Sequence, residues 1–190
     1  GVDLSVRDDF STVTYNLYSV DSRSFHSYTD YYFPDGALEK HPNCELYKGW
    51  VKAGYLKLCK GDIIDYQQIV DDILKMANYL CIMGIGYDPY KSAEFVNLLS
   101  SSVGGEADII NPVKQTYGTF TSPVESFEIA IYSNKISFDP NPITPYCFAN
   151  AILDEDRNCN KKPIKKTHNA KIDSTITNLM TFHLFNNLTS

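Results

Sequence analysis

The stretch Gly1-Val2-Asp3-Leu4-Ser5, followed by Thr12-Val13-Thr14-Tyr15-Asn16-Leu17-Tyr18, decides the fold of this chain. The second part alternates between polar and apolar residues, which predicts a β-strand with one buried face. We expect Asp3 to lie inside the strand before it, between Val2 and Leu4. Carboxylates are rare in strands, and burying one is costly unless a positive group compensates it. A bound metal ion would supply that compensation.

Two further aspartates stand at the edges of predicted elements. The apolar run 81–87 ends in Asp88-Pro89, and Lys171-Ile172-Asp173 opens the last amphipathic segment. Hard divalent cations prefer carboxylate oxygens, so we predict that Asp3, Asp88 and Asp173 form one metal-binding cluster. Each residue also has an ordinary alternative. Asp3 fits a capped edge strand, Asp88 an Asp-Pro turn, and Asp173 a helix N-cap.

Composition narrows the class of protein. With 190 residues and 43% hydrophobic content, the chain predicts a single domain over residues 1–190. No run approaches 18 apolar residues and no basic segment precedes an apolar one at the N-terminus, so we predict neither a membrane span nor a signal peptide, and an intracellular location. The five cysteines are odd in number and lack a C-x-x-C pair, which favours free thiols over disulfides or structural zinc.

The net charge of −6 would repel nucleic acid if it were spread evenly over the protein. DNA phosphates respond to the local charge of the surface they approach, so a positive patch can still bind them. A basic strip precedes Asp173 within eleven residues and consists of Lys161, Lys162, Lys165, Lys166, His168 and Lys171. Such a strip is either a solvated loop or a phosphate-binding surface. A carboxylate cluster beside it favours phosphate.

Hydrophobic periodicity predicts the order of the elements. The expected strands and helices are a three-stranded antiparallel meander over 1–6, 12–20 and 24–33, an amphipathic helix over 65–80, a buried parallel strand over 81–87, a helix over 91–99, a strand over 107–115, a helix from 122 to about 134, a hairpin formed by 148–153 and 163–166, and a final helix from Asp173.

Two of these helices carry specific signals. Ser122-Pro123-Val124-Glu125 has a capping residue, a proline at the first helical position and a glutamate that completes a capping box. The spacing in the final helix predicts that its buried face contains Ile176, Leu179, Met180 and His183.

The order β-β-β-α-β-α-β-α, with acids on the first strand, after the fourth strand and on a late helix, is the layout of the ribonuclease H-like fold. We therefore expect an α/β domain with a mixed central sheet, in which the antiparallel meander is extended by parallel strands and flanked by helices. The first and fourth strands are neighbours in this arrangement. Ligands collect where the carboxyl ends of such strands meet, so the three aspartates would converge there.

Several motifs resemble the nuclease domain of tailed-bacteriophage terminase large subunits, the DNA-packaging motors. The resemblance covers nearly the whole chain, and it departs from the family at Tyr146, where members often carry Trp, and at Ser11, where they often carry Thr. In chain order the matching residues are Gly1-Val2-Asp3-Leu4-Ser5 with Asp9-Phe10-Ser11, Tyr47 with Trp50-Val51 and Gly54, Gly61-Asp62-Ile63-Ile64-Asp65-Tyr66, Gly86-Tyr87-Asp88-Pro89-Tyr90, Ser122-Pro123, Asn141-Pro142 with Tyr146 and Asn150, and Lys171-Ile172-Asp173.

The resemblance implies a metal-dependent endonuclease that cuts double-stranded, concatemeric phage DNA during genome packaging. Two Mg²⁺ or Mn²⁺ ions about 3.5 to 4 Å apart would act on the phosphodiester. Asp3 would bridge both ions, and Asp88 and Asp173 would each bind mainly one. The further residues expected to take part are Asp9 and His168 as supporting neighbours of the ligands, and Lys165, Lys166 and Lys171 as DNA contacts.

The chain contains no G-x-x-x-x-G-K-[ST] phosphate loop, so it is not itself the ATP-driven motor. In the full-length protein, the resemblance implies an ATPase domain, a small terminase subunit and a portal as partners, and the host cytoplasm as the location of a phage or prophage protein. Two alternatives stay open at this point. One is another ribonuclease H-like nuclease, such as a resolvase or transposase core, and the other is a non-enzymatic acidic binding module.

Overall fold

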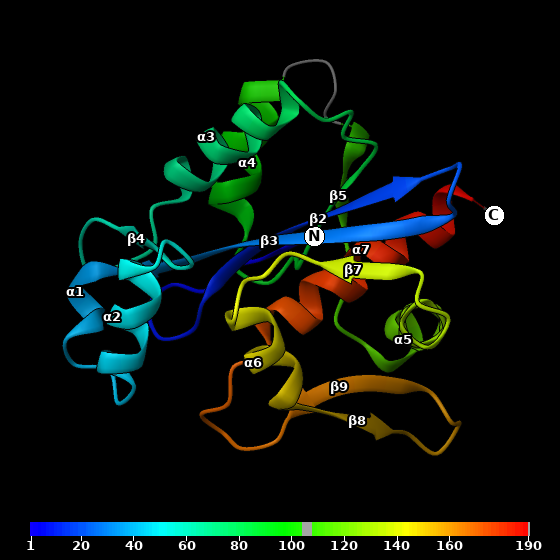
Figure 1. Ribbon diagram of the computed structural model, residues 1–190. Coiled ribbons are helices and arrows are strands. Elements are labelled where there is room, and N and C mark those ends of the chain that lie inside the picture. The colour runs from blue at the N-terminus through cyan, green and yellow to red at the C-terminus, as the bar shows by residue number, and fades with distance from the viewer. Residues whose placement is uncertain (104–107, 190) are drawn as a thin grey trace.

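The computed structural model describes residues 1–103 and 108–189, and it shows a mixed central sheet with helices on both faces (Figure 1). The sheet has the strand order β4-β3-β2-β1-β5-β6, and β7 pairs with β3 beside β4. The strands of this sheet are β1 Val2–Asp3, β2 Ser11–Ser19, β3 Ser24–Pro34, β4 Lys57–Cys59, β5 Ile85–Tyr87, β6 Ile110–Pro112 and β7 Ile136–Phe138.

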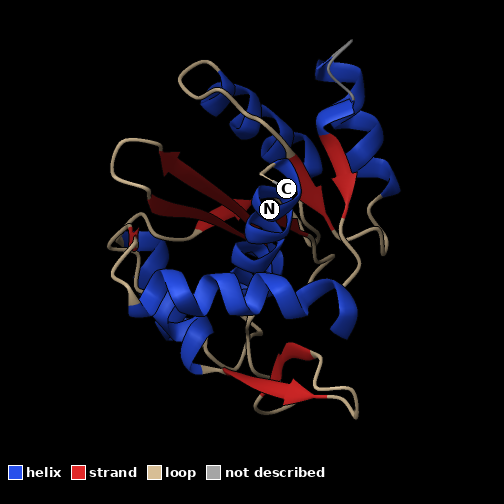
Figure 2. Ribbon diagram, turned by 90° about the vertical axis from the view of Figure 1, so that its right-hand side faces the viewer, coloured by secondary structure: helices blue, strands red, loops and turns tan. Residues whose placement is uncertain are grey.

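A separate two-stranded hairpin is formed by β8 and β9, which span Ala151–Glu155 and Lys161–Lys165. It lies against α5, away from the central sheet (Figure 2). The helices are α1 Asp35–Leu38, α2 Cys44–Lys52, α3 Tyr66–Ala77, α4 Ala93–Val103, α5 Tyr117–Tyr132, α6 Ile143–Ala149 and α7 Asp173–Leu188.

The alternation in β2 places its side chains on two different faces of the sheet. Val13 and Tyr15 join Val2 in a core that α3 and α4 cover. Thr14 points to the opposite face, where its hydroxyl lies 2.6 Å from the hydroxyl of Thr177 on α7. This two-residue period is what the sequence predicts, and the antiparallel pairing of β1, β2 and β3 confirms the expected meander. The predicted length of its first strand, 1–6, is wrong, because β1 is only Val2–Asp3 and Asp3 ends the strand instead of lying inside it.

Parallel strands extend the meander on both sides. β4 and β7 pair in parallel with β3, and β5 pairs in parallel with β1, with Val2 opposite Tyr87. The predicted strand over 81–87 is wrong in length, because β5 starts only at Ile85. The length of β5 is limited by its two neighbours. β1 has only two residues, and the pairing of β5 with β6 begins at Ile85 and Ile110. Cys81 and Met83 are consequently exposed rather than buried.

The predicted start of α5 at Ser122 is also wrong. The helix begins at Tyr117, and its N-cap is Thr116, whose side chain accepts a hydrogen bond from the Thr119 amide. Pro123 therefore lies inside the helix and cannot donate to the carbonyl four residues earlier. The backbone of Thr119 instead hydrogen-bonds the side chain of His183 on α7.

Other boundaries differ by less. Helix α3 ends at Ala77 rather than residue 80, and α4 covers Ala93–Val103 rather than 91–99. The strand expected over 107–115 is seen as β6, and residue 107 lies outside the described residues. The expected first strand of the hairpin is partly wrong, because residues 148 and 149 end α6 and β8 begins at Ala151. His183 on α7 is half-buried.

The sequence did not predict α1, α2, β4, β7 or α6. Most of these elements surround an aromatic core in which Phe10 touches the rings of Tyr31, Phe33, Tyr47 and Trp50. This core fixes the loop between β1 and β2 against α2, and a third core joins α5 to α7. The loop and α7 therefore have fixed positions beside the end of β1.

All five cysteines are free thiols, as predicted. Among the helices of the described residues, none has both the length and the apolar composition that crossing a membrane requires.

Candidate metal centre

Asp3 and Asp88 lie at the ends of two neighbouring parallel strands. Asp3 is the last residue of β1, and Asp88 comes directly after β5. The amide of Asp88 donates a hydrogen bond to the carbonyl of Val2 at 3.4 Å, which continues the ladder between the strands. Both carboxylates consequently project from the carboxyl edge of the sheet.

Asp173 approaches the same edge from a different element. It is the first residue of α7, which packs across β1, β2 and β5. Its side chain is 6% exposed, and Oδ2 is buried without a hydrogen-bond partner. An acidic residue in the first turn of a helix is favoured by the helix dipole, yet an unpaired buried oxygen is costly. That oxygen is available to a cation.

The electrostatics of the carboxylates show that they share one region. Burial raises the pKa of Asp3 well above its usual value of 3.8, and the negative charges of Asp173 and Asp88 raise it further. Burial raises the pKa of Asp173 to about 7, with an additional contribution from Asp9. Carboxylates that repel one another and lose water are stabilised as anions by a cation placed between them.

Gln115 was not predicted from the sequence, and it joins two of the carboxylates. Its Nε2 donates to Asp88 Oδ2 at 2.6 Å and lies 3.5 Å from Asp3 Oδ1. The other oxygen of Asp88, Oδ1, accepts from the Tyr90 amide at 2.9 Å. We call the contact of Gln115 with Asp3 and Asp88 the amide bridge.

Asp9 forms an ion-pair network beside the carboxylates. Its Oδ2 accepts from Lys165 at 2.9 Å, and its Oδ1 accepts from Lys171. Lys171 also donates to the carbonyl of Asp8 at 2.5 Å. Burial raises the pKa of Asp9, but its hydrogen bonds with the two lysines outweigh that effect, so the pKa is lowered. Asp9 is therefore an anion that holds the β1–β2 loop against the segment before α7.

This network changes what Lys171 is expected to do. Lys171 is 5% exposed and its ammonium group is paired, so it presents no charge to a DNA backbone in this structure. Lys165 is half-buried on Asp9 and lies close enough to Asp173 and Asp3 that their charges raise its pKa. Lys166, the residue after Lys165, is exposed, and it donates to the Ala149 carbonyl at 3.0 Å.

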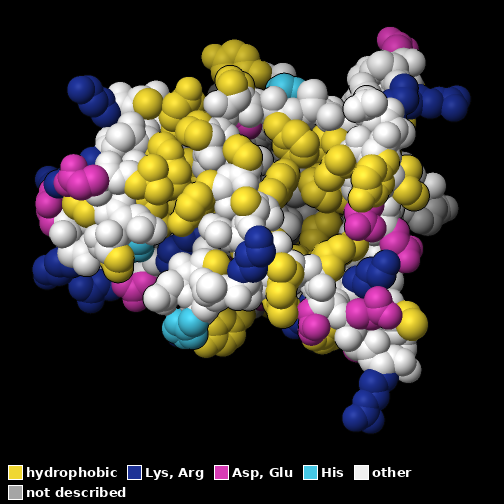
Figure 3. All heavy atoms as spheres, turned by 60° about the horizontal axis from the view of Figure 1, so that its bottom comes forward, with side chains coloured by type: hydrophobic (Ala, Val, Ile, Leu, Met, Phe, Trp, Pro, Cys, Tyr) yellow, Lys and Arg dark blue, Asp and Glu magenta, His cyan; other side chains and the backbone are white. Residues whose placement is uncertain are grey.

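His168 is exposed, and its Nδ1 lies 3.1 Å from the side-chain oxygen of the neighbouring Asn169. This hydrogen bond does not involve an aspartate of the cluster. On the underside of the molecule, where β8 and β9 lie, Lys and Arg side chains are scattered among hydrophobic ones, without a continuous basic patch in the described part of this face (Figure 3).

The residues fit a hard divalent cation by their chemistry. The donors are carboxylate oxygens, and Asp173 Oδ2 is a buried oxygen that has no partner. As the side chains stand, no three His, Cys, Asp or Glu residues within 1–103 and 108–189 enclose a metal position. The Gln115 amide contacts both Asp3 and Asp88.

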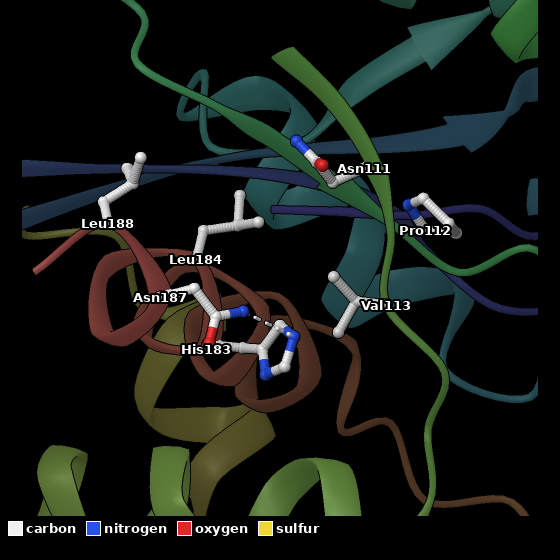
Figure 4. Close-up of a pocket in the computed structure, with 7 residues that line it drawn as sticks. All are labelled: Asn111, Pro112, Val113, His183, Leu184, Asn187 and Leu188. Atoms are coloured by element: carbon white, nitrogen blue, oxygen red, sulfur yellow. Dashed lines mark hydrogen bonds between the residues drawn. The ribbon is translucent and has the colours of Figure 1, made fainter. Parts of the chain in front are cut away.

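Two hollows of the surface lie away from the aspartates. A cavity of about 220 Å³ lies between β6 and α7, with His183 hydrogen-bonded to Asn187 at 3.2 Å on its wall (Figure 4). A larger apolar groove of about 520 Å³ follows β2, residues 80–85 and the C-terminal half of α7. Neither is lined by Asp3, Asp88 or Asp173.

The chain resembles solved structures along nearly its whole length. It matches the large terminase of bacteriophage HK97 with a TM-score of 0.85 and 19% identity, over 96% of this chain and 38% of that one. The nuclease of the large terminase of thermophilic phage G20c matches with a TM-score of 0.59 and 8% identity, over 96% of this chain and 78% of that one. The predicted ribonuclease H-like arrangement is thereby confirmed.

A third structure is the nuclease domain of the large terminase g2p of bacteriophage SPP1 with bound Mn, which has a TM-score of 0.54 and 12% identity, over 98% of this chain and 84% of that one. Among curated proteins, Protein YmfN of Escherichia coli (strain K12) is 28% identical over 173 residues, which are 87% of this chain and 36% of YmfN. The chain thus spans little more than a third of the length of YmfN and of the HK97 protein.

The family profile described as "Terminase large subunit, endonuclease domain" matches residues 1–187. This match runs from the strand that carries Asp3 to the helix that begins at Asp173, and so includes every residue of the candidate centre. The chain belongs to the terminase large subunit endonuclease domain family.

Proposed function

We propose that this chain is a divalent-metal-dependent endonuclease that hydrolyses phosphodiester bonds in double-stranded DNA. One observation carries the proposal. Asp3, Asp88 and Asp173 come from three distant parts of the sequence, and the charges of Asp173 and Asp88 both raise the pKa of Asp3. Carboxylates that repel one another and lose water at one edge of the sheet are costly without cations, and they can bind cations that act on a phosphodiester.

Asp3, Asp88 and Asp173 would hold Mg²⁺ or Mn²⁺. When bound, such ions activate a water molecule for attack on phosphorus and stabilise the negative charge on the leaving oxygen. The solved relatives from SPP1 and G20c, whose structures are described with bound Mn and bound magnesium, support the choice of metal.

The neighbouring residues fix the geometry of the centre. Asp9 ties the loop after β1 to Lys165 and Lys171, so the strand that carries Asp3 and the helix that carries Asp173 are held together. The half-buried ammonium of Lys165 moderates the negative charge of Asp3 and Asp173. Lys166 would contact a DNA phosphate from the solvent side.

The biological substrate would be concatemeric phage DNA, cut during genome packaging in the cytoplasm of the host. Because the chain spans about 36% of YmfN and 38% of the HK97 protein, an ATPase domain, a small terminase subunit and a portal are proposed as partners of a longer protein. Family membership supports this assignment, and DNA cleavage is its first test.

Supercoiled plasmid incubated with the purified chain and Mn²⁺ or Mg²⁺ is expected to become nicked and then linear. The measurement is gel electrophoresis of time points, with the same protein in excess chelator as the control. Cleavage that continues unchanged in chelator would contradict the metal-dependent mechanism.

Removing the charge of Lys166 is expected to weaken binding to all DNA sequences about equally. One lost phosphate contact lowers the slope of log affinity against log salt concentration by about 0.9. Affinity should be measured over a salt series for wild type, Lys166→Ala and the control Lys40→Ala, an exposed lysine between α1 and α2. An equal slope for wild type and Lys166→Ala would exclude Lys166 from the DNA contact.

A further inference from the structure

Gln115 lies at the point where three successive strand ends meet. Asp3 ends β1, Asp88 follows β5, and Gln115 follows β6, which pairs in parallel with β5. The pairing continues one residue past β6, because the Val113 amide donates to the Tyr87 carbonyl at 2.7 Å. The three side chains therefore share one edge of the sheet.

The backbone around Gln115 is fixed on both sides. Val113 is held by β5, and Thr116 is the N-cap of α5. A turn joins them, in which the Thr116 amide donates to the Lys114 carbonyl at 2.9 Å. The fixed backbone keeps the base of the Gln115 side chain beside the two carboxylates, and the side chain can still turn about its own torsions.

The amide bridge has a defined polarity. Carboxylate oxygens only accept hydrogen bonds, so the amino group of Gln115, and not its carbonyl oxygen, must face Asp3 and Asp88. Its partly positive hydrogens point at Asp88 Oδ2 and Asp3 Oδ1. A metal ion shared by these two residues would need the same oxygens.

We propose that the Gln115 amide takes the place of a cation between Asp3 and Asp88 in the metal-free protein and must leave these oxygens when an ion binds. The inference rests on the proposed metal centre. Gln115 is then a positioning residue that keeps the two carboxylates together without metal and lowers the metal affinity of the centre.

Competition between the Gln115 amide and a metal ion predicts opposite changes in metal-free stability and in metal affinity, and both can be measured. Hydrogen bonds to charged groups stabilise a folded protein, so losing the amide bridge destabilises the metal-free state. If the bridge is absent in the metal-bound state, the same change makes metal binding tighter. Gln115→Met keeps the approximate size of the side chain but cannot donate, and it is expected to lower the metal-free Tm and to tighten Mn²⁺ binding about tenfold.

A lysine in place of Gln115 should have the opposite effects on metal-free stability and on metal affinity. Gln115→Lys places a full positive charge beside Asp3 and Asp88, so we expect a higher metal-free Tm and Mn²⁺ binding that is weakened at least about tenfold. The matched control is Gln67→Met, because Gln67 donates to Asp71 at 2.8 Å on the exposed side of α3. The control should change neither quantity.

The experiment is Mn²⁺ titration calorimetry with thermal melts in chelator for wild type and the three variants. Weaker Mn²⁺ binding by Gln115→Met at an unchanged metal-free Tm would overturn the inference, because the amide would then support the bound ion. Unchanged melting of both Gln115 variants in chelator would overturn it as well. A wild type that binds no Mn²⁺ would refute the proposed metal centre, and the melts in chelator would still decide whether the amide holds the carboxylates.

Discussion

Asparagine in place of Asp173 is expected to abolish DNA cleavage while stabilising the metal-free protein. Loss of one carboxylate ligand should lower the cleavage rate at least about 1,000-fold, which corresponds to about 4 kcal/mol of transition-state stabilisation. The stabilisation has a separate cause. The pKa of Asp173 is raised from 3.8 to about 7, so the native fold resists ionisation of this group.

The sign of the pH dependence follows from that shift. The unfolded chain loses the Asp173 proton near its usual pKa of 3.8, whereas the folded protein keeps it until about 7. Stability is therefore lost as the pH rises between these values, by at most about 4 kcal/mol at neutral pH and above. Asparagine resembles the neutral acid, so the gain in Tm over wild type should be present at about pH 8 and absent at about pH 4.

Thermal melts in chelator at both pH values, together with plasmid cleavage in Mn²⁺, test this expectation. Asp71→Asn is the control, because Asp71 is exposed on α3 and is not one of the three proposed metal ligands. An Asp173→Asn protein that melts lower than wild type at about pH 8 and still cuts DNA would show that Asp173 is a structural residue.

Lys171→Met is expected to cause the largest loss of stability among the changes considered. It removes the buried partner of Asp9 and the donor to the Asp8 carbonyl. Breaking a buried ion pair from one side costs 3 to 5 kcal/mol, but Asp9 is 36% exposed and can be rehydrated, so we expect about 2 to 3 kcal/mol. That loss lowers the Tm by roughly 4 to 12 °C for a chain of this size.

A double-mutant cycle measures the interaction energy between Lys171 and Asp9 separately from their contacts with other residues. Adding Asp9→Asn to Lys171→Met should cost less than the sum of the two single changes, because no unpaired charge is left. The control Lys48→Met removes an exposed lysine that pairs with Glu39 at 3.0 Å, and its effect should stay within about 0.5 kcal/mol. If Lys171→Met and Lys48→Met lowered stability equally, Lys171 would not have the structural role assigned to it.

The strand that carries Asp3 could be predicted because its signal is local. Val2 and Leu4 flank the carboxylate, and the alternation in the next strand specifies which face each residue takes. The placement of Asp88 followed from an apolar run that ends in Asp-Pro. These patterns depend only on neighbouring residues in the sequence, so they can be recognised without knowledge of the tertiary contacts.

The start of α5 shows where local signals compete. Thr116 and Ser122 are both good caps, and the capping box favours Ser122. The helix nevertheless begins at Tyr117, because Phe120 in its first turn is buried in the core shared with α7. Burial of an aromatic side chain is worth more than a cap, and this burial depends on a helix more than fifty residues away.

The amide bridge and the Lys171 pair could not be predicted for a similar reason. Gln115 has no signal of its own, and its role depends on the register of β5 with β6. Lys171 and Asp9 are 162 residues apart, so only the folded chain shows that they neutralise each other. The sequence alone does not distinguish Lys171 from the other lysines of the basic strip, which are less buried.

Helix α7 is also a mechanical element. Its 16 residues form a rod roughly 24 Å long, with Asp173 at one end and Leu188 in the wall of the apolar groove at the other. A helix of this length that is packed along a sheet moves as a stiff unit. The position of Asp173 therefore depends on the packing of the whole helix against β1, β2 and β5, including turns that lie far from the carboxylates.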